Sequence, residues 1–193
     1  MTLMQTNLED FEDVVKTAIK TGAKKVGFKT YVPDRKLGVE DPEYVGAADA
    51  LLVFRRTGEL MEQYGDKIMI LNSDVLWQII EPTNPKIDEA KTCNKYLTGC
   101  SAGYMALSVL SDGTVYPCRR LPISIGNIRE GISSLIIESE VMQELRDLDK
   151  IRRNTLCDKV VHCRGCRAVA YAVTGDYMAK DPMCFKHLLG EKK

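Results

Sequence analysis

The chain has 193 residues, a formal net charge of zero, 45% hydrophobic, 28% charged and 7% aromatic residues. This composition predicts a folded globular protein with one or two cores and excludes extensive disorder. No apolar run is long enough to cross a membrane, and the first residues lack the basic region of a signal peptide. The balance of 27 basic and 27 acidic residues gives no electrostatic reason to expect nucleic acid. We therefore expect a cytoplasmic protein with neither a membrane nor a nucleic-acid partner.

The first half of the chain predicts alternating strands and helices. In chain order we expect a short strand at 1–5, a helix at 8–19, a strand at 24–32, a loop at 33–44, a helix at 47–63 and a strand at 67–72. Asn7 is the expected N-cap of the first helix, and Gly22 its C-terminal stop. This alternation predicts parallel strands joined by crossover helices. These two and a half strand–helix units are too few to close a barrel, so they form either a small open sheet or a sheet whose edge pairs with something absent from this chain.

The second half predicts a small domain that begins with a β-hairpin. Segments 104–110 and 114–118 flank the turn Ser111-Asp112-Gly113, which is typical of a hairpin. Further along we expect a helix with Val141, Leu145, Leu148 and Ile151 on one apolar face, and a short helix at 168–173 that Gly175 ends.

Seven cysteines are the most informative feature of the chain. They are Cys93, Cys100, Cys118, Cys157, Cys163, Cys166 and Cys184. A reducing compartment disfavours structural disulfides, and an odd number cannot pair completely. Because the first half contains none, the composition itself divides the chain near residue 90.

The spacing of these cysteines predicts a metal centre. Thiolates separated by two to six residues can converge on one centre, because the short loops between them bend back and direct backbone N–H groups at the anionic sulfurs. Cys157, Cys163 and Cys166 have this spacing, and Cys184 follows them. Seven thiolates exceed the four ligands of one zinc ion and suit two clusters that share them as four and three.

Other interpretations of the cysteines stay open on spacing alone. A single zinc site could use Cys157, Cys163, Cys166 and Cys184, with His162 in place of one of them. Buried free cysteines would account for one or two of the seven. Catalytic cysteine chemistry is disfavoured, because only His162 and His187 could act as the base and neither lies in a recognisable nucleophile motif. We expect His162 to lie beside the ligands or to face solvent.

Characteristic turn segments accompany the cysteines. The set comprises Cys100-x12-Gly113-x4-Cys118, Cys157-x5-Cys163-x2-Cys166 and Cys184, within LSDGTVYPC (110–118), IGNI (125–128), CRGCRAVAYAVTGDY (163–177) and DPMC (181–184). These motifs resemble the SPASM domain, the C-terminal extension of radical SAM enzymes that carries auxiliary [4Fe–4S] clusters. The resemblance covers roughly residues 93 to 186. The CxxC followed by Arg-Ala is most similar to the subgroup that includes haem-biosynthesis and peptide-modifying maturases.

The resemblance implies how the cysteines are shared between clusters. Cys93, Cys100, Cys118 and Cys166 would ligate the first cluster, and Cys157, Cys163 and Cys184 the second. Full members of the family have one more cysteine, three positions before Cys157, where this chain has Asn154. The fourth iron of the second cluster would then be held by a side chain such as Asp158, by water or by substrate, or that cluster would be absent or reduced to three irons. The change to Asn154 is also compatible with a decaying gene copy.

The first half resembles, less specifically, the last two or three units of a radical SAM barrel, with YVPDR (31–35) similar to the loop after the fifth strand. The implied fold is α/β: the C-terminal portion of a partial (β/α)6 barrel of parallel strands at 1–92, followed by a small α+β SPASM domain with a β-hairpin and short helices at 93–193. The CxxxCxxC loop whose cluster cleaves S-adenosylmethionine is absent from this sequence. The chain is therefore not expected to be catalytic alone, and S-adenosylmethionine would bind only with a missing N-terminal half.

The function implied is that of the iron–sulfur cluster-binding C-terminal part of a radical SAM/SPASM enzyme, of the peptide-modifying or haem- and cofactor-maturation type. Its partners would be an N-terminal radical SAM half or subunit and a peptide, small-molecule or tetrapyrrole substrate. The auxiliary clusters would transfer electrons or bind substrate. Four arginines near the cysteines are candidates for tuning the potential of the clusters: Arg119, Arg120, Arg164 and Arg167. Arginines are, however, more commonly solvated surface residues. The alternatives are a stand-alone iron–sulfur electron-transfer or binding protein and a zinc-stabilised interaction module.

Overall fold

The computed structural model describes residues 1–80, 99–155, 157 and 159–190. In chain order its helices and strands are β1 Thr2–Leu3, α1 Phe11–Lys20, β2 Lys25–Thr30, α2 Ala47–Tyr64, β3 Met69–Asn72, β4 Ser108–Val109, β5 Val115–Tyr116, α4 Ile132–Glu138, α5 Glu140–Arg146, α6 Leu148–Thr155 and α7 Arg167–Thr174. Within these described ranges, no helix is both long and apolar enough to cross a membrane.

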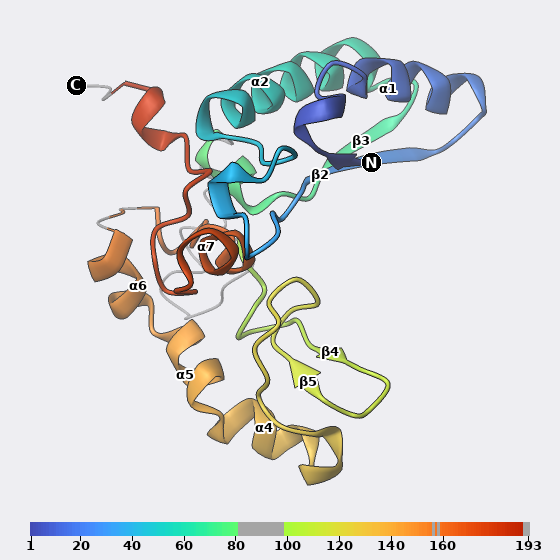
Figure 1. Cartoon of the computed structure of the whole chain (residues 1–193). Helices are drawn as coiled ribbons and strands as arrows, with labels where there is room; N and C mark the ends of the chain where they lie inside the picture. The colour runs from blue at the N-terminus through green and yellow to red at the C-terminus, as the bar shows by residue number, and fades with distance from the viewer. Residues whose placement is uncertain (81–98, 156, 158, 191–193) are drawn as a thin grey trace.

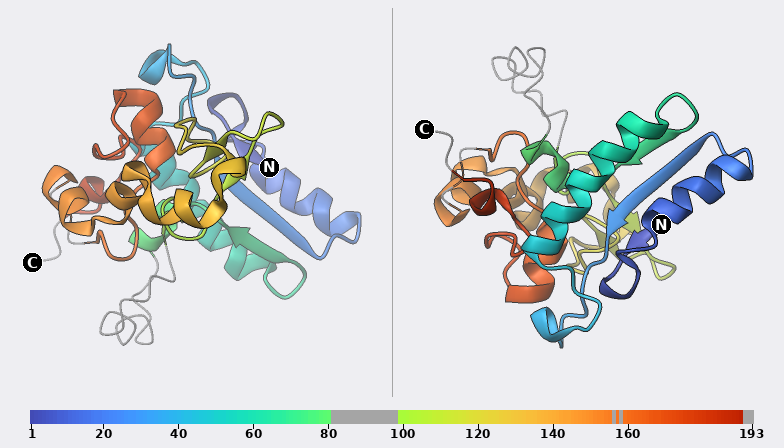
Figure 2. Two further views of the ribbon diagram at one scale, coloured as in Figure 1. Left: turned by 90° about the horizontal axis from the view of Figure 1, so that it is seen from below. Right: turned by 90° about the horizontal axis from the view of Figure 1, so that it is seen from above.

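The first half is an open parallel sheet covered by helices on one face. The strand order is β1-β2-β3 and both pairs are parallel, with Lys25 opposite Met69 and Thr2 opposite Lys29. Helices α1 and α2 lie side by side over the sheet (Figure 1; Figure 2, right). The prediction of parallel strands joined by crossover helices is therefore confirmed.

The alternation of buried and more exposed residues along β2 explains how the sheet packs against the helices. Val26 and Phe28 are buried and point to the helices, where the ring of Phe28 meets that of Phe11 edge to face at 5.5 Å between centroids. Burying such a side chain contributes about 1.5–3 kcal/mol. On the opposite face of the sheet, Met69 and Leu71 of β3 are 52% and 43% exposed.

The N-terminal cap of α1 differs from the prediction. Asn7 closes a separate 3-10 turn at Gln5–Asn7, because its side-chain oxygen accepts the backbone N–H of Met4 at 2.9 Å. The helix itself begins at Phe11, with Asp10 at the N-cap. The Asn7 side chain is used for a local hydrogen bond in the turn after β1, so it does not cap α1. The helix therefore starts about one turn later than predicted. Its end near Gly22, which has φ +75°, is as predicted.

The single helix predicted across 141–151 is wrong, because the chain breaks it at Asp147. That residue has φ −75° and ψ 88°, and its carboxylate accepts the backbone N–H of Lys150 at 2.7 Å, which caps α6. Leu145 and Ile151 consequently enter different core clusters. Helix α4 before this break has no counterpart among the expected elements.

The hairpin is confirmed, with shorter strands than the apolar runs predicted. Ser108 pairs with Tyr116 and Val109 with Val115 in antiparallel register. The second strand ends early because Cys118 turns back to bridge with Leu121. The hairpin lies at the far side of α7 from the sheet (Figure 1).

One hydrophobic core connects the two halves. Its buried members include Val45, Phe54 and Leu76 from the first half and Cys100, Cys163, Cys166, Val169 and Phe185 from the second. The ring of Phe54 lies 5.2 Å from that of Phe185 and 5.9 Å from that of Trp77, between centroids. The boundary expected at residue 92 lies outside the described residues.

Candidate iron–sulfur site

Six of the seven cysteines predicted as ligands lie in described residues, and Cys93 lies outside them. All six are free thiols. Cys100, Cys163 and Cys166 are buried in one core, and the half-buried Cys118 and Cys184 pack against it. Cys157 is also half-buried.

Electrostatic interactions divide these thiols into two groups. Cys166 interacts with Cys100, whereas Cys163 interacts with Cys157 and Cys184. Cys184 in turn interacts with Cys157. The five residues thus fall into the same two groups that the sequence resemblance implies, although the ligand assignment itself stays a prediction.

Burial favours the protonated form of three of the thiols, those of Cys163, Cys166 and Cys184. Desolvation raises the pKa of Cys166 to about 12, and it also raises the pKa of Cys163 and of Cys184. Reactive cysteines show the opposite shift, a lowered pKa, so these groups do not have the character of nucleophiles. Bound metal deprotonates a coordinating thiol outright, which makes a metal centre the chemistry that suits such buried sulfur.

The loop between Cys163 and Cys166 curls around the sulfur of Cys163. Arg164 and Gly165 have φ of 61° and 65°, two consecutive left-handed residues. This conformation directs the backbone N–H of Gly165 at the Cys163 sulfur, with 3.4 Å between nitrogen and Sγ. Such concave runs of backbone N–H groups are suited to anions, including the thiolates of iron–sulfur sites.

Arg164 connects the two cysteine segments. It is 5% exposed, and its Nη2 and Nε donate to the carbonyl oxygen of Cys100 at 2.5 and 3.2 Å. The backbone N–H of Cys100 donates to the carbonyl of Cys163 at 3.2 Å, and the guanidinium lies 4.9 Å from the ring centre of Tyr104. This residue holds the Cys100 segment against the 163–166 loop.

Asp181 forms a second support for the cysteine loops, and sequence reasoning did not identify it. The buried carboxylate of Asp181 accepts the backbone N–H of Cys166 at 2.6 Å and that of Met183 at 2.9 Å. Burial raises the pKa of Asp181 to about 6, against the opposing effect of the Cys166 N–H and the Arg167 charge. Arg167 donates through Nη1 to the carbonyls of Tyr177 and Ala179. The only signal in the sequence was the position of Asp181 in DPMC.

Two of the four arginines that the sequence analysis named are not surface residues. Arg164 and Arg167 are 5% and 2% exposed, so the surface interpretation is wrong for both. Backbone carbonyls from other segments accept hydrogen bonds from both guanidinium groups, which offsets the cost of burying them, although the Nε of Arg167 is buried without a hydrogen-bond partner among the described residues. Arg119 is exposed, and Arg120 is half-buried with Nη2 3.8 Å from the Cys166 sulfur and Nη1 3.2 Å from the Thr30 carbonyl.

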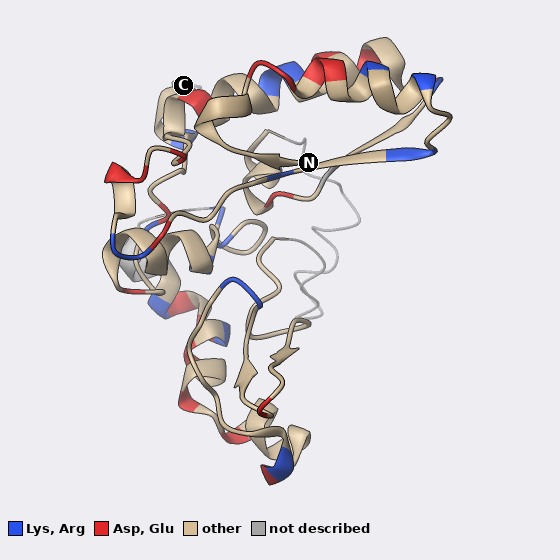
Figure 3. Ribbon diagram, turned by 45° about the vertical axis from the view of Figure 1, so that its right-hand side comes forward, with Lys and Arg blue, Asp and Glu red and all other residues tan. Residues whose placement is uncertain are grey.

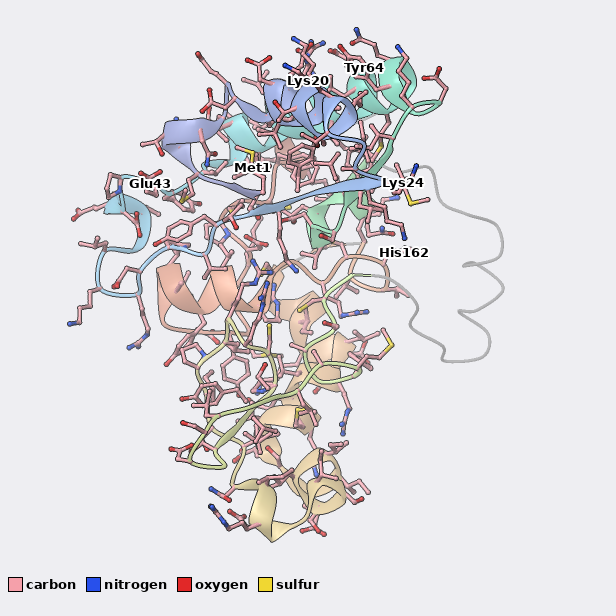
Figure 4. The ribbon with its side chains drawn as sticks, turned by 90° about the vertical axis from the view of Figure 1, so that its right-hand side faces the viewer. Met1, Lys20, Lys24, Glu43, Tyr64 and His162 are labelled. Carbon is pink, nitrogen blue, oxygen red and sulfur yellow. The ribbon has the colours of Figure 1, made fainter. Side chains whose placement is uncertain are left out.

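His162 does not face solvent. It is 7% exposed and lies on the side of the sheet opposite α1 and α2 (Figure 4). Among the residues the structure describes, no three His, Cys, Asp or Glu side chains converge as one metal ion would require. The donor set fits iron–sulfur clusters by its chemistry, with thiols in two groups, a backbone amide on one sulfur and a guanidinium on another.

Comparison with known families agrees with this chemistry. Residues 100–167 match the model of SPASM, an iron–sulfur cluster-binding domain. The chain therefore carries an iron–sulfur cluster-binding domain.

Three known enzymes are similar in sequence to part or nearly all of this chain. The AdoMet-dependent heme synthase of Methanosarcina barkeri is 43% identical over 88 residues, 45% of this chain and 25% of that protein. The enzyme of the same name from Nitratidesulfovibrio vulgaris is 26% identical over 95% of this chain and 52% of its own length. PqqA peptide cyclase of Rhizobium meliloti is 34% identical over 51% of this chain and 29% of its own. This chain is similar to the SPASM-bearing part of radical SAM enzymes.

The fold is also shared with solved structures. Native anSMEcpe with bound AdoMet superposes on 97% of this chain with a TM-score of 0.65 and 15% identity, using 51% of its own length. The chain thus has an α/β fold with a parallel sheet, similar to that structure, and it spans about half the length or less of the relatives it matches.

Proposed function

We propose that this chain holds two auxiliary [4Fe–4S] clusters for a radical SAM enzyme. Cys93, Cys100, Cys118 and Cys166 would hold the first, and Cys157, Cys163 and Cys184 the second. The observation that carries the proposal is that Cys166 interacts with Cys100 whereas Cys163 interacts with Cys157 and Cys184, in a chain whose residues 100–167 match the SPASM model. When bound, such clusters supply one-electron transfer or an iron position open to substrate.

The chain's own residues would set the properties of the clusters. The Gly165 N–H on the Cys163 sulfur and the Arg120 guanidinium on the Cys166 sulfur place positive charge beside the ligands. Hydrogen bonds to sulfur, nearby charge and burial are the protein's means of tuning a cluster's potential. Arg164 and Asp181 would keep the ligand segments in place through their bonds to Cys100 and Cys166.

The proposed partner is an N-terminal radical SAM half that supplies the cluster on which S-adenosylmethionine is cleaved. Two observations support it. Parallel sheets are normally covered on both faces, yet within the described part of the chain Met69 and Leu71 are exposed on the face opposite the helices. The chain also spans about half the length of the Nitratidesulfovibrio relative. The sheet would then be the last part of a partial (β/α)6 barrel, in a cytoplasmic enzyme acting on a peptide or a tetrapyrrole.

Anaerobic purification tests the cluster proposal. Two four-iron clusters predict a brown protein with about eight iron and eight sulfide per chain. Cys166→Ser and Cys184→Ser should each remove about half of that iron, because each belongs to a different group. A colourless protein with stoichiometric zinc would overturn the proposal, as would a single variant that removes all iron while the chain stays folded by circular dichroism.

Asn154→Cys tests the three-thiolate second cluster. The position falls in α6, before Cys157. We expect the new thiol to raise the iron content or the oxygen resistance of that cluster. Unchanged iron and unchanged oxygen sensitivity would contradict the proposed alignment.

Co-purification tests the partnership. A neighbouring reading frame that encodes CxxxCxxC should yield a chain that binds this one and cleaves S-adenosylmethionine in the complex. Failure of the two chains to associate would leave a stand-alone iron–sulfur protein as the better description.

A further inference from the structure

A pocket of about 420 Å³ lies beside the cysteine site. It forms where the carboxyl ends of β1 and β2 meet α7 and the segment after Cys118. Its polar lining comprises Thr2, Lys29, Thr30, Tyr31, Arg35, Arg119, Arg120 and Tyr171. Ligands of parallel α/β folds bind at the carboxyl ends of the strands, so this is the expected place for one.

The lining of the pocket is strongly basic. It includes four cationic side chains and no carboxylate. Within the described residues, Lys29, Arg35 and Arg119 form no ion pair with an acidic side chain. Figure 3 shows basic positions between the sheet layer and the hairpin. Unneutralised cations around one concave surface favour an anionic occupant.

Two of the arginines are held in place. The guanidinium of Arg35 lies over the ring of Tyr171, 4.7 Å from its centre, which leaves the guanidinium edge available. Arg120 is fixed through the carbonyl of Thr30 and the sulfur of Cys166, so it contributes charge and a physical link to the cysteine site. Arg119 is exposed at the rim.

The rest of the wall is apolar. Val32, Pro33, Ala168 and Ala172 line the same pocket. An inorganic anion would gain nothing from these groups, whereas an organic molecule would bury hydrocarbon surface against them. The occupant thus needs an apolar body as well as negative charge.

We propose that this pocket binds an organic acid that carries at least two carboxylates on an apolar body. The planar fork of an arginine matches a carboxylate with two parallel hydrogen bonds, and Arg35, Arg119 and Lys29 provide for more than one such group. The inference rests on the proposed function, because it assigns the substrate class for the site beside the first cysteine group.

Calorimetric titration of the anaerobic chain with a naphthalene dicarboxylate tests the proposal. The dicarboxylate should bind, and its dimethyl ester should bind at least tenfold more weakly. Arg35→Gln and Arg119→Gln should each weaken binding about 10- to 100-fold, the effect of losing hydrogen bonds to a charged group. Arg55→Gln, an exposed arginine of α2 outside the pocket, is the matched control and should bind as the unmodified chain does.

Equal binding of the acid and its ester would overturn the proposal, as would equal binding by the Arg35 and Arg55 variants. Inorganic phosphate that binds as tightly as the dicarboxylate would also overturn it, because the apolar body would then contribute nothing. Iron analysis of the same samples separates the two proposals. If the chain contains iron but does not bind the acid, only the proposal about the pocket is refuted. If the chain binds the acid but contains no iron, only the proposal about the clusters is refuted.

Discussion

The variant Asp181→Asn measures how much the buried Asp181 carboxylate stabilises the loops that carry the cysteines. The Asp181 carboxylate accepts two backbone N–H groups, from Cys166 and Met183, through different oxygens. Asparagine offers one oxygen, so its NH2 group would face one of these donors inside the core. The variant loses a charge-assisted hydrogen bond, leaves a buried N–H without an acceptor and removes the counter-charge of Arg167. Together these losses amount to about 2–4 kcal/mol of unfolding free energy.

Urea unfolding followed by circular dichroism under reducing, anaerobic conditions measures this loss. With an m-value of about 2–3 kcal/mol/M, the midpoint should fall by about 1 M. Asp176→Asn is the control, because Asp176 accepts the N–H of Met178 at 2.7 Å in the same kind of two-residue turn but is exposed. Its effect should stay within about 0.5 kcal/mol. Equal midpoint shifts for the two variants would refute the argument that burial makes Asp181 important.

Gly165→Ala should destabilise the chain by about 2–4 kcal/mol in the same assay, since φ is +65° and a Cβ would lie 2.7 Å from that of Asp181. Gly22→Ala, with φ +75° and nothing within 4 Å, should lose only about 1 kcal/mol, and equal losses would contradict the crowding at Gly165. Asp41→Asn tests a pH dependence. Two backbone N–H groups of its loop lower the pKa of Asp41, so its stabilising effect is present above the ordinary carboxyl pKa and is lost as the pH falls through the folded-state value. Unfolding free energies measured from about pH 6 to pH 3 should fall less steeply for the variant, and parallel curves would contradict that role.

The sheet was predictable because local and long-range preferences agree there. The alternation of β2 and the apolar run of β3 leave one way to bury Val26, Phe28 and Ile70 against helices. Apolar periodicity failed at 141–151 because it does not reveal which core a residue joins. Leu145 packs with Cys100 whereas Ile151 packs with Val160, and the chain must bend between them.

The sequence predicted the cysteines of the candidate site, but not the buried side chains that hold the cysteine segments in place. Cysteine spacing identified the thiols without any knowledge of the fold. The burial of Arg164 and Arg167 depends on carbonyl groups of residues 100, 177 and 179, which only tertiary structure brings to them. The Asp181 bond to Cys166 likewise joins residues fifteen positions apart. Charged side chains are assigned to the surface by default, so sequence patterns cannot identify such cases.

The core that connects the two halves gives the chain an intrinsic optical reporter. Trp77 is the single tryptophan of the sequence, and it packs on Phe54, whose other neighbour Phe185 directly follows Cys184. Indole fluorescence at this position is sensitive to the packing of the cysteine-bearing half, although the tryptophan belongs to the other half. We therefore expect the emission of this one residue to report loading or loss of the proposed clusters in the unlabelled protein.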